Sequence, residues 1–227
     1  QFVGIDAVEK IWRDSGVVGG NFPKDLTLAL GSITTKPIDM ALFYAALANG
    51  GFQVTPQYIY KIENKFGEII YEAKPQKKKI FEPEDVAILT YMLQNAVNYG
   101  TGQSAKVFKN GKLIPMAGKT GTTSDYVSAW FTGYTPTLAT VVYVGNDDNK
   151  SMGGGMTGGA AAGPIWKNYM QSVVNIENYN VGFFEFIDDY IKRKDLTLRE
   201  IDLKIGLLDT DGVDRRTALF KAGTEPI

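Results

Sequence analysis

The sequence predicts a mixed α/β (α+β) fold in which helices pack against an antiparallel sheet. Segments with helical signals lie at 38–47, 83–97 and 164–174. Short segments rich in β-branched and aromatic residues follow one another at 120–123, 127–134 and 138–144. Because tight turns join the latter three, we expect an antiparallel meander with helices on its faces.

The composition limits the chemistry available to the chain. It has 227 residues, 44% hydrophobic and 22% charged, which is enough to bury a core in one domain with or without an appendage. Lys plus Arg number 24 and Asp plus Glu 25, so the net charge of −1 gives no electrostatic case for a nucleic-acid partner. The absence of His and Cys excludes a Ser–His–Asp triad, a thiolate nucleophile and His or Cys metal ligands.

The amino-terminal stretch 2–12 is helical in pattern, with Ile5, Val8 and Trp12 on one face. The chain starts at Gln1 and contains no long apolar run, so we see neither a signal peptide nor a membrane-spanning helix. With no cap ahead of that first helix, we interpret the chain as a fragment of a longer protein.

The segment 38–47 carries the strongest helical signal. Thr35 offers a cap, Pro37 suits the first turn and Gly50 ends the helix. Its residues are apolar nearly all round, which predicts a helix buried in the core. If the chain is a fragment, part of this apolar surface would be exposed. We therefore expect that the chain can exchange segments with a second copy or form oligomers.

The remaining segments complete the order of elements. Strands at 54–62 and 66–71 predict a small hairpin, an insertion of about 53–75 outside the main core. Asn110-Gly111 marks a tight turn. We assign 1–176 to one domain portion and 177–227 to a carboxy-terminal extension, where charged and aromatic residues mix without periodicity and no element is predicted.

Three motifs resemble binding sites but lack the required spacing. Gly118-Lys119-Thr120 is not a phosphate loop, because no Gly stands at position 113 and strand-like sequence follows it. Asp209-Thr210-Asp211-Gly212 fails the calcium-loop pattern, since its Gly is fourth rather than sixth. Asp147-Asp148 fits a turn. We therefore expect no metal site.

The segment Gly153–Gly158 formally satisfies G-x-G-x-x-G, the dinucleotide fingerprint. Seven residues separate it from the preceding Gly145, Pro164 would interrupt the following helix, and the strands before it read as a meander. We favour a Gly-rich turn that lets a helix pack closely on the sheet, and keep a nucleotide-binding oxidoreductase as an alternative.

The stretch Lys119 to Thr123, Lys-Thr-Gly-Thr-Thr, has a definite chemical interpretation. A strand at a sheet edge offers backbone N–H groups to an oxyanion, and its hydroxyls can bind a carboxylate. Lys119 would add positive charge, and Gly121 would let a substrate backbone approach closely. Lys-Thr-Gly is one of three motifs of the penicillin-recognising serine enzymes.

On these residues the chain resembles the transpeptidase domain of the class A, bifunctional penicillin-binding proteins, with a serine β-lactamase/D,D-transpeptidase-like fold. The similar segments, in family order, are 28–32, 44–51, 99–102, 117–123, 129–136, 144–148, 153–166 and 223–226. The family's other two motifs are absent. No Ser or Thr here has Lys three positions later, and no Ser-x-Asn occurs, so the nucleophile and its base are missing from this chain.

The resemblance implies roles for the matching residues. Lys119 would supply positive charge, the hydroxyls of Thr120 and Thr122 would hold the terminal carboxylate of a D-Ala-D-Ala peptide or a β-lactam, and the Thr122 N–H would be an oxyanion donor. Gly121 and Thr123 complete the substrate-binding set. Trp130 and Tyr134 we assign to packing.

The predicted function is therefore part of a peptidoglycan D,D-transpeptidase, inactive as this fragment alone, that uses no cofactor. Stem peptides and β-lactams are the expected ligands, with no nucleic acid. By resemblance, the parent would also be a glycosyltransferase, anchored in the bacterial cytoplasmic membrane with this domain on its outer side. A non-catalytic pseudo-enzyme or interaction module is the second alternative, because the nucleophile is missing.

Overall fold

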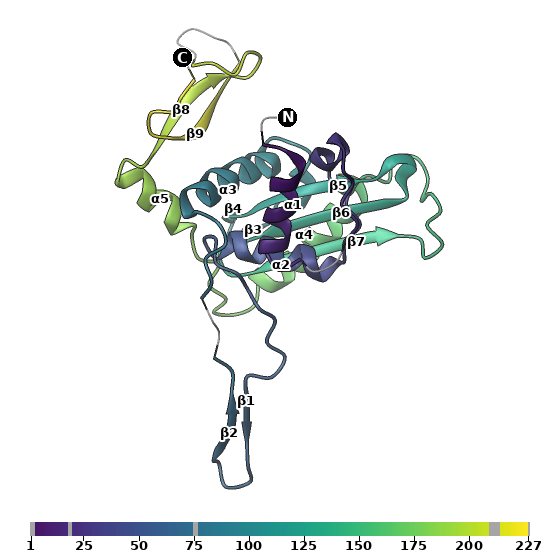
Figure 1. Ribbon diagram of the computed structural model, residues 1–227, viewed down its shortest axis with the longest axis vertical. Helices are drawn as coiled ribbons and strands as arrows, with labels where there is room; N and C mark the ends of the chain where they lie inside the picture. Colours follow the sequence, from purple (N-terminus) through teal and green to yellow (C-terminus); the bar gives the residue numbers. More distant parts are fainter. Residues whose placement is uncertain (1–2, 18–19, 75–76, 209–213, 227) are drawn as a thin grey trace.

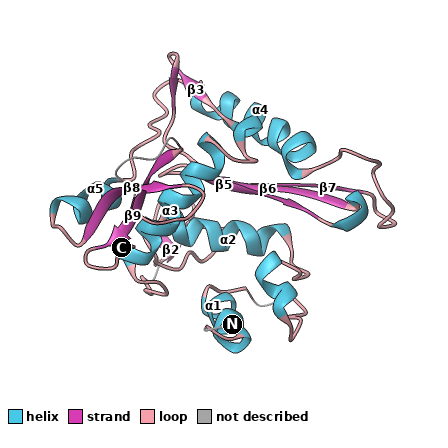
Figure 2. Cartoon of the chain, turned by 90° about the horizontal axis from the view of Figure 1, so that it is seen from above, coloured by secondary structure: helices cyan, strands magenta, loops and turns pink. Residues whose placement is uncertain are grey.

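The computed structural model describes residues 3–17, 20–74, 77–208 and 214–226 (Figure 1). At its centre lies a three-stranded antiparallel sheet in the order β5-β6-β7, formed by β5 (Ala117–Thr122), β6 (Ser128–Tyr134) and β7 (Ala139–Gly145). This confirms the predicted meander. Helix α2 (Pro37–Ala48) covers one face of the sheet and α4 (Gly163–Val174) the other (Figure 2).

The α4 face holds one of two apolar cores. Trp166 is fully buried there, with its ring centroid 5.2 Å from that of Phe131 on β6. The indole N–H of Trp166 donates to the carbonyl of Thr140 at 3.0 Å, so its one polar group is satisfied. α4 begins where the sequence predicts, after a π-helical turn, η4 (Gly158–Ala162).

The α2 face is organised around Tyr134, which is fully buried as its assignment to packing requires. Its ring contacts Tyr44 of α2 edge-on at 6.0 Å. Its hydroxyl shares a 2.8 Å hydrogen bond with Thr90 of α3 (Pro83–Asn98), a helix that matches the prediction. Burial raises the pKa of Tyr134, and it raises the pKa of Tyr44 to about 12, so both phenols are neutral at physiological pH.

Helix α2 is less buried than its apolar sequence predicts. Only Tyr44, Ala46 and Leu47 are buried, whereas Ile38 is 50% exposed. The expectation of burial all round is wrong, because the helix packs along one side against β6 and β7. The remaining apolar surface agrees with the expectation that a fragment leaves part of 38–47 exposed.

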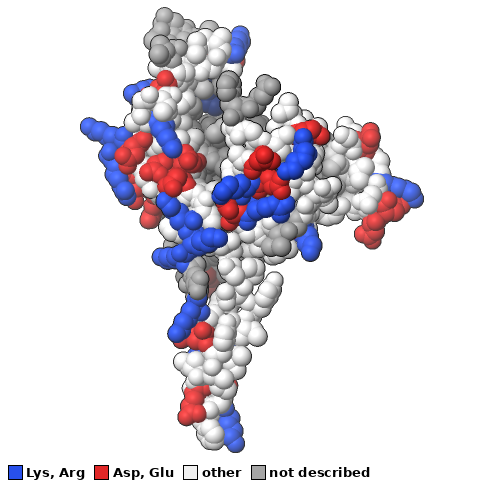
Figure 3. Space-filling view, viewed as in Figure 1, with Lys and Arg blue, Asp and Glu red and all other residues white. Residues whose placement is uncertain are grey.

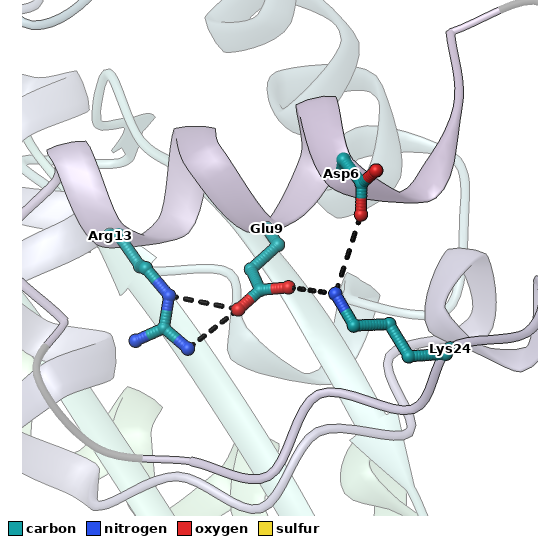
Figure 4. A network of polar contacts seen from close by, with 4 residues as sticks. All are labelled: Asp6, Glu9, Arg13 and Lys24. Carbon is teal, nitrogen blue, oxygen red and sulfur yellow. Dashed lines mark hydrogen bonds and ion pairs between the residues drawn. The ribbon is translucent and has the colours of Figure 1, made fainter.

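Helix α1 (Ile5–Asp14) lies against α2, where Trp12 stacks on Phe43 with centroids 4.6 Å apart. Glu9 links it to the loop that follows (Figure 4): it accepts from Arg13 at 2.6 Å and from Lys24 at 2.5 Å. These bonds hold the pKa of Glu9 below its usual value, chiefly through Lys24, and the pKa of Lys24 above its own.

Two hairpins flank this body. β1 (Lys61–Glu63) and β2 (Ile69–Glu72) form an exposed hairpin that projects away from the sheet (Figure 1). Its ladder ends at the hydrogen bond from the Ala73 N–H to the Tyr60 carbonyl. The predicted strand at 54–62 therefore begins too early, because residues 54–60 are not part of β1. The second hairpin, β3 (Phe108–Lys109) and β4 (Lys112–Leu113), turns at Asn110-Gly111 as predicted.

The carboxy-terminal part forms α5 (Glu185–Lys192) and an antiparallel pair, β8 (Leu196–Asp202) and β9 (Arg215–Lys221). Buried apolar residues tie it to the α2–α3 core: Phe184, Ile187, Leu196 and Leu219. These elements therefore share the main core rather than hanging free of it.

In the described ranges three short 3-10 turns complete the elements: η1 (Leu26–Leu30), η2 (Gln103–Ala105) and η3 (Ser124–Tyr126). On the face drawn in Figure 3, basic and acidic side chains lie intermingled. Within the described ranges, no helix has the combined length and apolar character that crossing a bilayer requires.

Candidate functional site

Strand β5 carries the predicted site, Lys119 to Thr123, along and just beyond its second half. In the described part of the chain β5 pairs with β6 alone, with Lys119 opposite Thr132 and Gly121 opposite Trp130. It is therefore an edge strand, and one of its two rows of backbone groups faces away from the sheet. The expected location of the motif, at a sheet edge, is confirmed.

A groove of about 400 Å³ runs along this strand. Lys119, Thr120, Gly121, Thr122 and Thr123 all line it. The other walls come from Trp12 of α1, Tyr44 of α2 and residues 29–31 at the end of η1. The structure thus brings every predicted site residue to one cavity.

The polar side chains of this strand contact one another and a neighbouring loop. The ammonium of Lys119 donates to the Thr120 carbonyl at 3.0 Å and lies 3.3 Å from its hydroxyl. The Thr120 hydroxyl shares a 2.7 Å hydrogen bond with that of Thr101. The Thr122 hydroxyl accepts the Gly158 N–H at 2.9 Å, which leaves its own proton free to be donated.

The backbone N–H of Thr122 points away from β6, toward the open edge of the sheet. Thr123, the next residue, donates its N–H to the Ser128 carbonyl at 3.1 Å and so points into the sheet. Because successive N–H groups alternate along a strand, that of Thr122 faces the open edge. This is the orientation that an oxyanion donor at this position needs.

The last threonine of the motif has a structural contact. The hydroxyl of Thr123 accepts the Ser128 N–H at 2.7 Å, across the turn between β5 and β6. It borders the groove while its oxygen holds the turn together.

Gly121 lies in the floor of the groove, against Trp130. A Cβ at Gly121 would lie 3.1 Å from the Cβ of Trp130, tighter than ordinary packing. Trp130 itself packs on Tyr143 of β7, with ring centroids 4.7 Å apart, so it has little freedom to move aside. The glycine is therefore required by its packing against Trp130, and its expected role in letting a substrate backbone approach stays a prediction.

The Gly-rich segment 153–158 is not a dinucleotide site. It joins an antiparallel strand to η4, and every strand pair in the described ranges is antiparallel, so no β-α-β unit precedes the loop. A Cβ at Gly158 would lie 2.5 Å from the Gly121 carbonyl oxygen and closer still to that of Trp130. The favoured interpretation, a turn that packs a helix closely on the sheet, is confirmed, and the oxidoreductase alternative is wrong.

The other rejected motifs also have structural explanations. Lys119 lies inside a strand and not at a helix start, so Gly118–Thr120 forms no phosphate loop. Asp148 caps a turn and pairs with Lys150 at 2.7 Å. No cluster of metal-ligating side chains occurs among the residues that the structure describes, and 209–212 lie outside them.

Two residues of the site were not singled out from the sequence. Thr101 follows α3 and meets Thr120 from 19 positions away, and Gly158 meets Thr122 from 36 positions away. The only sequence signal for either was membership of the segments 99–102 and 153–166, which carry the family resemblance without assigning a role.

Comparisons with known proteins agree with this geometry. A family model described as the penicillin-binding protein transpeptidase domain matches residues 13–171. Penicillin-binding protein 1A of Neisseria gonorrhoeae is 33% identical over 174 residues, 74% of this chain and 21% of that protein. The same-named protein of Aquifex aeolicus is 32% identical over 224 residues, 99% of this chain and 29% of its own length. The chain thus spans less than a third of these relatives.

Solved structures give the same result. The crystal structure of penicillin-binding protein 1A from Haemophilus influenzae matches with a TM-score of 0.75 and 25% identity, covering 99% of this chain and 37% of that one. The PonA1 protein of Mycobacterium tuberculosis, solved in complex with penicillin V, matches with a TM-score of 0.66 and 24% identity, covering 79% of this chain and 52% of that one. The second match supports the fold alone.

Proposed function

The chain belongs to the penicillin-binding protein transpeptidase family, and from that premise we propose that it forms the substrate-binding wall of a peptidoglycan D,D-transpeptidase. One observation carries the proposal. The Lys119 ammonium, the hydroxyls of Thr120 and Thr122 and the outward N–H of Thr122 lie on one edge strand beside one groove. A peptide ending in a carboxylate needs these groups: positive charge, hydroxyl donors and an oxyanion donor.

The proposed reaction is an acyl transfer through a serine ester. A serine attacks the amide carbonyl between two D-Ala residues, the terminal D-Ala leaves with the proton, and an amine of a second stem peptide then takes the acyl group and releases the serine. In this chain Thr120 and Thr122 would hold the terminal carboxylate and the Thr122 N–H would stabilise the oxyanion. The ammonium of Lys119 would stabilise the negative charges of the carboxylate and of the oxyanion.

The nucleophile belongs elsewhere in the parent protein, since this chain has no Ser-x-x-Lys. We infer that the parent is membrane-anchored, that it places this domain outside the cytoplasmic membrane, and that it binds stem peptides and β-lactams. The description of the matching family, a penicillin-binding protein transpeptidase domain, supports the inference that the parent binds β-lactams. A parent with glycosyltransferase activity as well is the class A expectation.

Labelling with a fluorescent penicillin tests the proposal. The full-length protein should form a covalent adduct, and the 227-residue chain alone should not. In the full-length protein, Lys119→Ala should slow acylation by about 10²- to 10³-fold, the usual effect of losing a preorganised polar contact. Lys112→Ala, which removes an exposed lysine of β4, is the matched control.

Two results would contradict the proposal. An adduct on the isolated chain would place a nucleophile where the sequence has none, and a wild-type rate for Lys119→Ala would remove β5 from the site. A full-length protein that is never labelled would favour the alternative of a non-catalytic pseudo-enzyme or interaction module.

A further inference from the structure

The carboxy-terminal strand β9 lies along α3, the helix that ends beside the site. Near the start of α3 the Lys221 ammonium pairs with Asp85 at 2.7 Å. In the middle of the helix the Tyr91 hydroxyl donates to the Thr217 carbonyl at 3.4 Å. The strand therefore runs opposite to the helix, and its first residues lie at the carboxy-terminal end of α3.

At that end Arg216 contacts Tyr99, the residue that caps α3. The guanidinium carbon lies 4.5 Å from the centroid of the Tyr99 ring, which is the geometry of a cation–π contact. Tyr99 is 59% exposed, so little else packs against its ring. The contact thus holds the chain at the point where it leaves the helix.

Thr101 follows two residues later, between Gly100 and Gly102, and its hydroxyl shares the 2.7 Å hydrogen bond with Thr120. When Thr101 donates in this bond, the Thr120 hydroxyl keeps its own proton for a substrate carboxylate. Glycine on both sides leaves the backbone of Thr101 with little stiffness of its own. Its place therefore depends on the anchors beside it, which are the bond from the Gly102 N–H to the Ala96 carbonyl at 3.0 Å and the aromatic contact with β9.

We propose that Arg216 is a positioning residue for the transpeptidase site: by holding Tyr99, it keeps Thr101 in place to orient the motif hydroxyl. The inference rests on the proposed function, in which the Thr120 hydroxyl holds the substrate carboxylate. It gives the carboxy-terminal segment a role beyond its packing in the core, because one strand of that segment holds the loop that directs a group of the site.

A purely structural role for β9 makes a different prediction. If the strand only stabilises α3, the loss of either charged contact with the helix should affect the site alike. Lys221 contacts the same helix from the same strand, but its partner Asp85 lies about 20 Å along the helix from Tyr99. Lys221→Gln is therefore the matched control for Arg216→Gln, since each variant loses one positive charge and one contact between β9 and α3.

The test measures the second-order rate of acylation by fluorescent penicillin in the full-length protein. Arg216→Gln should slow acylation about two- to fivefold, the factor that corresponds to an exposed cation–π contact. Arg216→Lys keeps a cation for the ring and should recover most of the lost rate. Lys221→Gln should match the wild type.

A double variant shows whether the effect passes through Thr101. Thr101→Val removes the hydroxyl and keeps the shape of the side chain, so it should slow acylation by itself. In that background Arg216→Gln should have no further effect, because the group that it positions is gone. A structural role predicts instead that the two effects multiply.

Hydrogen exchange follows the same coupling without catalysis. The Gly102 amide is bonded to the end of α3, and Arg216→Gln should make it exchange faster than Lys221→Gln does. Equal exchange of this amide in the two variants overturns the positioning role.

Three kinetic results also overturn it and leave the proposed function standing. They are an unchanged rate for Arg216→Gln, equal slowing in Arg216→Gln and Lys221→Gln, and multiplied effects in the double variant with Thr101→Val. A wild-type protein that penicillin does not label contradicts the proposed function instead, and the exchange experiment still decides whether Arg216 holds this loop.

Discussion

The contact between Gly158 and the site strand can be tested with one methyl group. A Cβ at position 158 would lie 2.5 Å from the Gly121 carbonyl oxygen and 3.0 Å from the Gly121 nitrogen. Both atoms belong to the backbone of β5, so no side chain can rotate to make room. Gly158→Ala must therefore push η4 away from the strand that carries the motif.

The expected loss of stability follows from this geometry. Overpacking of a closed interior costs about 1–3 kcal/mol, and contact with backbone puts this site in the upper half of that range. Alanine recovers at most about 1 kcal/mol through its greater helix propensity. The net destabilisation should be about 1–3 kcal/mol, which for a chain of this size lowers Tm by roughly 2–12 °C.

Urea unfolding of the chain, followed by tryptophan fluorescence, measures this loss, because Trp166 is fully buried beside η4. Gly154→Ala is the control: no atom lies within 4 Å of its Cβ position and its φ is not left-handed. That variant should stay within about 0.5 kcal/mol of the wild type. Equal stability of the two variants would refute the close approach of η4 to β5.

Hydrogen exchange gives Gly158→Ala a second readout. The N–H of residue 158 donates to the Thr122 hydroxyl at 2.9 Å, and a displaced η4 would lengthen that bond. Its amide should then exchange faster in the variant, beyond the change expected from lower stability alone. An unchanged protection factor would show that η4 had kept its place.

Two further predictions concern α1 and the buried tyrosine. Bonds from Lys24 and Arg13 lower the pKa of Glu9, so the stability they add is present at neutral pH and is lost as pH falls through that lowered pKa. Glu9→Gln should remove this acid step from a titration of α1 followed by NMR, and a step that persists would point to another group. Thr90→Val leaves the buried hydroxyl of Tyr134 without its partner and should cost about 1–3 kcal/mol in urea unfolding. The double variant Thr90→Val, Tyr134→Phe should lose less stability than the two single variants lose together, because they remove the same hydrogen bond. Strict additivity of the two losses would contradict that shared bond.

The central sheet and its helices were predictable because their signals are local. β6 and β7 are β-branched and aromatic with short turns between them, and α2, α3 and α4 each carry Pro in the first turn. The degree of burial of α2 was not predictable, because an apolar helix shows what it could bury and not what lies beside it. Only the observed packing shows that Ile38 stays half exposed.

The carboxy-terminal elements had no such local signal. α5 is amphipathic, but its eight residues are only about two turns, too short for the period to be recognised, and the connection between β8 and β9 is long, so no tight turn marks the hairpin. Their order comes from tertiary contacts, chiefly those of Phe184, Ile187 and Leu196 within the core that also contains Tyr44, Val86 and Tyr134. Contacts of this kind join residues far apart in the chain, and no sequence window contains both partners.

The site, too, has a part that the sequence reveals and a part that only the structure shows. Lys119 to Thr123 could be found because the groups that do chemistry are contiguous on one strand. The atoms that orient them come from elsewhere: Thr101 holds the Thr120 hydroxyl and Gly158 holds that of Thr122. A hydroxyl can bind a carboxylate with useful strength only if its direction is fixed before the ligand arrives. The motif therefore supplies the donors, and the close packing that Gly158 permits supplies their direction, so a substitution that preserved every residue of the motif could still abolish the site.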